Sequence, residues 1–126
     1  MKLSGLFALT GVLGMLFGLE FLFIPEMALQ QYGVPTEPHN LMQARFFGST
    51  LFAFGLVNWL ARPTTDDVAR RALLVAGVLG NGGGLALSLW SRLNGLQGML
   101  AWLSVALYAA LLLAALYFLL RPSRRD

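Results

Sequence analysis

Few side chains in this sequence are suited to acid-base, nucleophilic or metal chemistry, and Glu20 is the foremost of them. It is the one acid within the apolar run 3–24, and Arg45 lies near the start of the next apolar run. Ionisable groups inside membrane-length apolar segments are costly and are functional candidates by default. Two interpretations of Glu20 follow: a proton-coupled or cation-binding carboxylate, or half of a static ion pair.

Metal and hydrolytic chemistry find little support. The chain has no cysteine and one histidine, His39, which lies beside Pro38 in a polar segment. A metal site normally needs three or four ligands, and a catalytic triad needs a base beside a nucleophile. We therefore expect no metal site, no cofactor and no enzymatic activity, although a hydrophobic cofactor held by aromatic packing stays open.

The composition is that of a membrane protein. Of 126 residues, 57% are hydrophobic and 12% are charged, with a mean hydropathy of +0.68, whereas soluble domains are about a quarter charged. About 20 apolar residues in helical form cross a bilayer core. Four stretches reach this length: 3–24, 41–61, 68–91 and 97–120. The expected fold is all-α, an antiparallel four-helix membrane bundle that forms one domain over residues 1–126.

The basic residues predict the orientation of these spans. Seven of the nine fall on one side, namely Lys2, Arg62, Arg70, Arg71, Arg121, Arg124 and Arg125. The positive-inside rule makes that side cytoplasmic, so we expect both termini in the cytoplasm of a bacterial inner-membrane protein. Contact with anionic headgroups then explains the basic pI better than nucleic acid does. The first span lacks a small-x-small cleavage site and is expected to remain in the mature protein.

The connections contain recognisable helix signals. Pro25 to Gly33 reads as a short interfacial helix, with proline in its first turn and glycine after its end. The segment Thr64-Thr-Asp-Asp67 resembles a capping box, in which a threonine oxygen accepts from free amides at the start of the third span. Asn94-Gly95 predicts a tight turn before the fourth span.

Residue counts place Glu20 and Arg45 at matching depth, each about 6 to 8 Å inside the outer ends of adjacent antiparallel spans. An ion pair would remove much of the cost of burying either charge, so we predict a salt bridge between spans 1 and 2. On span 2, residues at three- and four-residue spacing share the face of Arg45, which is expected to point inward: Gly48, Ser49, Phe52, Gly55 and Leu56.

Small residues mark further packing faces. On span 1 a stripe formed by Ser4, Gly11, Gly14 and Gly18 lies almost opposite Glu20, so this stripe is expected to meet a third helix or a second copy. On span 3, Gly77, Asn81, Gly84 and Ser88 share one face. Close helix packing and an unwound, site-lining segment are both compatible with the glycine cluster at 77–84. Asn58 and Asn81 are candidates for interhelical hydrogen bonds or ligand contacts, and Ser104 and Tyr108 can join the same polar layer.

Three segments resemble those of small bacterial four-span membrane proteins related to the DoxX-like families: "FLFIPEMALQQYGVP" at 21–35, "ARFFGSTLFAFGLVNWLAR" at 44–62 and "RRALLVAGVLGN" at 70–81. The resemblance implies a four-helix bundle and supplies no reaction. Small multidrug transporters also have four spans and a carboxylate in the first, but nearer the middle of the span and with balanced loop charges.

Two functions are compatible with these patterns. The first is a non-enzymatic scaffold or accessory subunit that packs against itself or a larger membrane complex. The second is a binder or transporter of a small lipophilic or cationic molecule that uses Glu20, Arg45, Asn58 and Asn81. The lipid bilayer is the expected partner in both, and nucleic acid in neither.

Overall fold

The computed structural model describes residues 2–95, 98 and 101–121, and these residues form five helices without a strand. The four long helices follow the predicted spans within a few residues. The predicted start of the fourth span at Gln97 and the basic residues Arg124 and Arg125 lie outside the described residues. The helices are α1 (Leu3–Phe23), α2 (Pro25–Gln31), α3 (Pro38–Ala61), α4 (Asp67–Leu93) and α5 (Ala101–Leu120).

Local signals set the ends of these helices. Pro25 is the first residue of α2, and Gly33 follows the helix with φ of 74°, in the left-handed region that favours glycine. Asp66 caps α4 by accepting a 2.8 Å hydrogen bond from the Ala69 amide. The predicted threonine cap is therefore replaced by an aspartate, while the Thr64 hydroxyl accepts from the amide of Asp66.

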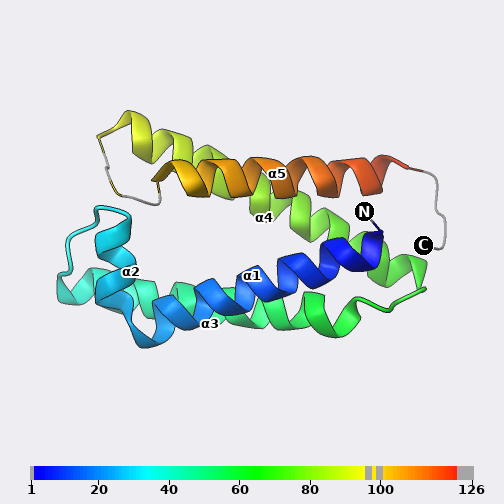
Figure 1. Ribbon diagram of the computed structural model, residues 1–126, viewed down its shortest axis with the longest axis horizontal. Coiled ribbons are helices and arrows are strands. Elements are labelled where there is room, and N and C mark those ends of the chain that lie inside the picture. The colour runs from blue at the N-terminus through cyan, green and yellow to red at the C-terminus, as the bar shows by residue number, and fades with distance from the viewer. Residues whose placement is uncertain (1, 96–97, 99–100, 122–126) are drawn as a thin grey trace.

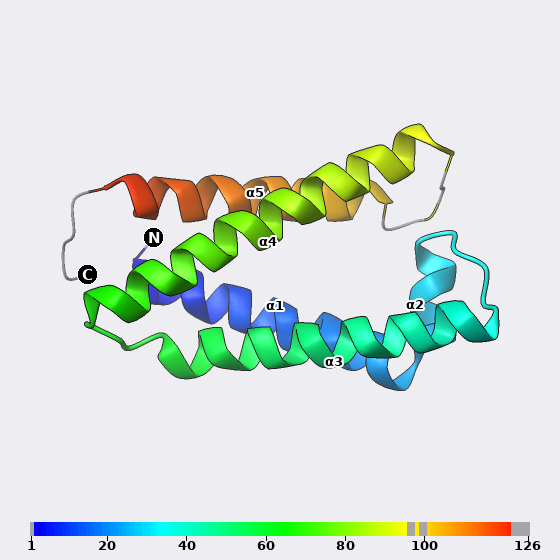
Figure 2. The same cartoon turned by 180° about the vertical axis from the view of Figure 1, so that it is seen from behind.

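The long helices form two pairs. α1 packs along α3, and α4 packs along α5 (Figure 1). The pairs meet near the start of α1, where Leu3, Leu6 and Phe7 join Leu74 and Phe118 in one apolar cluster. They diverge toward the other end, where α2 stands between them (Figure 2). There a second cluster gathers residues of α1, α2 and α3: Phe21, Ala28, Leu29 and Ala44.

Glycines bring α1 and α3 into backbone contact. A Cβ placed on Gly18 would lie 2.6 Å from the Phe52 amide nitrogen, and one on Gly55 would lie 2.7 Å from the Met15 nitrogen. Gly11, Gly14 and Gly48 are equally confined by the facing helix. The stripe on the first span therefore packs on the second span, contrary to the expectation that it meets a third helix or another copy.

The outer surface is strongly apolar. Leu79 is 71% exposed, Leu113 67% and Leu16 61%, and many other large hydrophobic side chains share this surface. Soluble monomers rarely expose continuous apolar areas of this extent. By length and composition α1, α4 and α5 can each cross a membrane. α3 is long enough, but it does not meet the same criterion.

Candidate ligand-binding cavity

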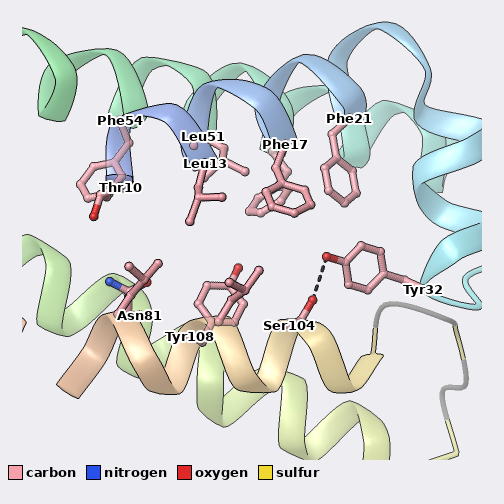
Figure 3. Close-up of a pocket in the computed structure, with 14 residues that line it drawn as sticks. Thr10, Leu13, Phe17, Phe21, Tyr32, Leu51, Phe54, Asn81, Ser104 and Tyr108 are labelled. Atoms are coloured by element: carbon pink, nitrogen blue, oxygen red, sulfur yellow. Dashed lines mark hydrogen bonds between the residues drawn. The ribbon is translucent and has the colours of Figure 1, made fainter. Parts of the chain in front are cut away.

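A cavity of about 90 Å³ lies between the two helix pairs. Every long helix contributes to its wall, and side chains from the two layers point toward one another across it (Figure 3). None of the lining side chains is charged, and most are apolar. The lining consists of Thr10, Leu13, Gly14, Phe17, Phe21, Tyr32, Phe47, Leu51, Phe54, Asn81, Ser104, Leu107, Tyr108 and Leu111.

A hydrogen bond lies across the cavity at its wide end, which is the end beside α2 where the two helix pairs diverge. The Ser104 hydroxyl of α5 donates to the Tyr32 hydroxyl, at the end of α2, over 2.8 Å (Figure 3). Burial raises the pKa of the Tyr32 phenol above its ordinary value of 10.0; the bond from Ser104 opposes this shift and the nearby Glu20 adds to it. The phenol is thus protonated at neutral pH.

Two further hollows adjoin this hydrogen bond. One, of about 130 Å³, is lined by Ser88, Ser91 and Arg92, and the other, of about 190 Å³, by Leu29, Val34 and Phe47. Tyr32 and Ser104 line both of them as well as the main cavity. The pair therefore lies where the three spaces adjoin.

Asn81 supplies a polar group in the middle of the wall. Its side chain is buried, and its Nδ2 donates 2.8 Å to the Gly77 carbonyl one turn earlier in α4. Asn58 bonds in the same way to the Phe54 carbonyl of α3, at 3.0 Å. Both asparagines line a small space at the narrow end of the cavity. Each amide donates within its own helix, and among the described residues neither forms the expected interhelical hydrogen bond.

Gly84 determines how Tyr108 enters the cavity. The Tyr108 ring lies so near Gly84 that an added Cβ would collide with three ring carbons. At Gly77 the nearest neighbour is the Ala115 Cβ at 3.6 Å, which is an ordinary contact. α4 runs through the glycine cluster as an uninterrupted helix, so the unwound segment considered from the sequence is absent. The glycines instead give room to an aromatic ring.

The predicted salt bridge between Glu20 and Arg45 does not form; the structure describes both residues and shows no ion pair between them. Arg45 is exposed, whereas Glu20 Oε1 is buried and has no hydrogen-bond partner. The reason is helical phase. At about 100° per residue, Glu20 points roughly 200° away from Gly18, whose face meets α3. Glu20 is also not among the residues that line the cavity.

Tyr32, Thr10 and Phe17 are cavity residues that the sequence patterns did not single out. Tyr32 stands at the end of a short helix, 72 residues from its partner Ser104. An aromatic residue within an interfacial connection was the available signal, because tyrosine presents an apolar ring with a polar tip. The predicted Ser104 and Tyr108 do lie on one wall (Figure 3).

The polar groups of the cavity are suited to orienting a bound molecule by hydrogen bonds. In the part of the chain that the structure describes, no three or more His, Asp or Glu side chains gather as a metal site would require. The groups facing the cavity are neutral hydroxyls, one amide and hydrocarbon. These groups can orient a ligand by hydrogen bonds but supply no strong acid or base.

Comparisons with family models, with curated proteins and with solved structures gave no match to this chain. The resemblance to the DoxX-like families accordingly stays a prediction from the sequence.

Proposed function

We propose that this chain is a four-span membrane protein that binds a small, neutral, lipophilic molecule between its two helix pairs. The observation that carries the proposal is the uncharged cavity with Tyr32 and Ser104 at its wide end. Ligand sites are typically concave and mostly apolar, with a few polar groups that fix orientation. The absence of charge from this lining favours a neutral occupant over the cationic one.

Packing supports the inclusion of α3 among the spans. It lies antiparallel to α1 in glycine-mediated contact from Gly48 to Gly55. A helix of 24 residues is about 36 Å long at 1.5 Å per residue, enough to cross a bilayer core. If α1 spans the membrane, α3 spans it too, because the two helices are in backbone contact. Lys2 and Arg121 then lie on the same side, which we assign to the cytoplasm of a bacterial inner membrane.

Cavity size limits the occupant. A volume of about 90 Å³ is well below the several hundred Å³ of most drug-sized pockets. A short alkyl chain or a single small ring bearing one hydroxyl or carbonyl group matches both volume and lining. Its polar end belongs beside Tyr32 and Ser104, and its hydrocarbon end among Phe17, Leu107 and Leu111.

Photolabelling tests this proposal. The probe is 3-azibutanol, a four-carbon alcohol with a photoreactive diazirine, added to the purified protein in neutral detergent. Peptide mass spectrometry is expected to find saturable adducts on cavity residues such as Phe17 and Tyr108. Leu107→Trp fills the cavity and should abolish these adducts. Leu103→Trp, on the exposed face of the same helix, is the matched control and should leave them unchanged.

Adducts spread evenly over the lipid-facing surface, with no saturation and no effect of Leu107→Trp, would show that the cavity binds nothing of this class. Organic extraction of the wild-type protein, followed by mass spectrometry against the Leu107→Trp variant, would then identify any occupant retained from the cell.

A second candidate function, a packing or accessory subunit of a membrane assembly, is favoured by the outer face of α4. Gly80 and Gly83 are exposed, and a Cβ on either would meet nothing within 4 Å. Interior glycines cost helix stability and serve in membranes to admit a neighbouring backbone. The glycines of α1, by contrast, are already used within the chain. Native mass spectrometry after mild extraction tests this candidate, and a lone chain in both the wild type and Gly83→Leu would contradict it.

A further inference from the structure

A separate hollow lies at the opposite, narrow end of the molecule, apart from the proposed lipophile cavity. It is a groove of about 500 Å³ bounded by the start of α1, the segment after α3 and the start of α4. These three segments lie close together at the end where the two helix pairs converge (Figure 2). Its polar lining comes from Ser4, Arg62, Thr64, Thr65, Asp67 and Arg70.

Both arginines are held in place by their own contacts. Arg62 Nη1 donates 2.7 Å to the Trp59 carbonyl, and the guanidinium lies 3.9 Å above the Trp59 ring. Arg70 Nη2 donates 2.8 Å to the Phe118 carbonyl of α5, while its Nε is buried without a hydrogen-bond partner. A guanidinium has five N–H donors, so each arginine keeps donors that its hydrogen bond to a backbone carbonyl does not use. Anchoring in this way reduces the conformational entropy that a ligand contact would cost.

The start of α1 adds further donors. The Gly5 and Leu6 amides both bond to the Lys2 carbonyl, and no side chain caps the helix. No described residue accepts from the Leu3 and Ser4 amides, which belong to the first turn that borders the groove. The positive end of the helix dipole therefore faces the same space as the two guanidiniums.

We propose that this groove binds a phosphate-bearing anion, either the headgroup of an anionic phospholipid or a free phosphate. Two guanidiniums and backbone amides are the donor set that recognises phosphate oxygens. The groove also lies at the end predicted to face the cytoplasm, beside the anionic leaflet surface. Asp67 also lines the groove, and its negative charge weakens the binding of an anion there. Removing this charge should therefore strengthen the binding.

The test uses Trp59 as a reporter, because its ring stacks on Arg62. Trp90→Phe and Trp102→Phe leave it as the one tryptophan of the purified protein in neutral detergent. Its emission is titrated with dihexanoyl phosphatidylglycerol, dihexanoyl phosphatidylcholine and inorganic phosphate. A saturable change with phosphatidylglycerol, and none with phosphatidylcholine, is expected. Saturation by inorganic phosphate at similar concentrations would identify a free phosphate as the ligand, and its failure to saturate would identify the lipid headgroup.

Substitutions test whether binding depends on the residues of the groove or only on the net charge of the protein. Arg62→Gln and Arg70→Gln should each weaken binding by about tenfold, the scale of one lost charge-assisted contact. Asp67→Asn should tighten it. Arg92→Gln, at the far end of the molecule, is the matched control and should not change it. Arg62→Lys keeps the charge and should retain weakened binding, which covers the case in which Arg62→Gln does not fold. Equal responses to both lipids, or equal effects of the Arg62 and Arg92 changes, would overturn the proposal.

Discussion

The close glycine contact between α1 and α3 makes a sharp stability prediction at Gly18. A Cβ at this position would lie 2.6 Å from the Phe52 nitrogen and 2.8 Å from the Gly48 carbonyl oxygen. Ordinary contact begins at 3.4 Å, so the methyl group is too close to the Phe52 nitrogen by about 0.8 Å. The obstructing atoms are backbone, which cannot rotate away as a side chain tip does. Gly18→Ala must therefore move the two helices apart.

The cost follows from that displacement. A gap of 0.5 to 1 Å forfeits about a quarter to a half of each dispersion contact across an interface. Overpacking of a well-packed core typically costs about 1 to 3 kcal/mol. We expect Gly18→Ala to lower the free energy of unfolding by an amount in this range. Gly83→Ala is the matched control: its Cβ meets nothing within 4 Å, and the gain in helix propensity is up to about 1 kcal/mol.

Reversible unfolding by sodium dodecyl sulfate in mixed micelles, followed by circular dichroism, measures both variants. The expected outcome is opposite signs, with Gly18→Ala less stable than wild type and Gly83→Ala equal to it or more stable. Equal stabilisation of both variants would show that helix propensity alone sets the effect, and equal destabilisation would show that the cost does not depend on the contact between α1 and α3. A fully stable Gly18→Ala protein would refute backbone contact between α1 and α3.

Four further predictions concern the cavity, the hydrogen bond between Tyr32 and Ser104, and the charges of Glu20 and Arg45. Gly84→Ala pushes the Tyr108 ring into the cavity, so 3-azibutanol labelling should fall several-fold, while Gly77→Ala should leave it unchanged. Tyr32→Phe and Ser104→Ala should each lower the free energy of unfolding by about 1 kcal/mol, and the double variant should cost little more than either, because one hydrogen bond is lost in all three. The raised pKa of Tyr32 means that the folded state favours the protonated phenol. This contribution to stability is complete below pH 10 and is lost as pH rises through the folded pKa. Between pH 6 and 9 the free energy of unfolding should therefore change with pH equally in wild type and Tyr32→Phe. Glu20→Gln and Arg45→Gln should have additive effects on stability, because the structure shows no contact between them, and a coupling above about 0.5 kcal/mol would contradict it.

The sequence predicts the helices well because their boundaries depend on local chemistry. Pro25, Gly33 and Gly95 each act through their own backbone preferences, and the two glycines adopt positive φ as their turns require. Apolar length likewise predicts where the long helices lie. Composition does not decide how many of them cross a membrane, because α3 combines the length of a span with polar residues whose surroundings only packing reveals.

Helix rotation is where sequence reasoning fails. Counting residues puts Glu20 and Arg45 at equal depth, but a salt bridge also needs both side chains to point into one interface. The rotation of α1 follows Gly11, Gly14 and Gly18, because along these residues its backbone lies directly against that of α3. A charge about 200° from that stripe cannot reach the helix that the stripe touches. The glycine stripe, rather than the two charges, is the pattern that predicts the observed rotation of α1 about its axis.

The position of the cavity follows from the different contacts within and between the two helix pairs. Glycines fix α1 against α3, and α4 against α5 is a separate pair, so the fold consists of two stiff units rather than four equivalent helices. At the narrow end the units are joined by a buried apolar cluster around Leu74. At the wide end a neutral hydrogen bond between Tyr32 and Ser104 spans them, and such a bond contributes only about 1 kcal/mol. Gly98 also lies against the backbone of Gln31 and Tyr32 at this end. If the cavity binds a lipophile as proposed, we expect the ligand to enter beside α2, at the end away from the Leu74 cluster.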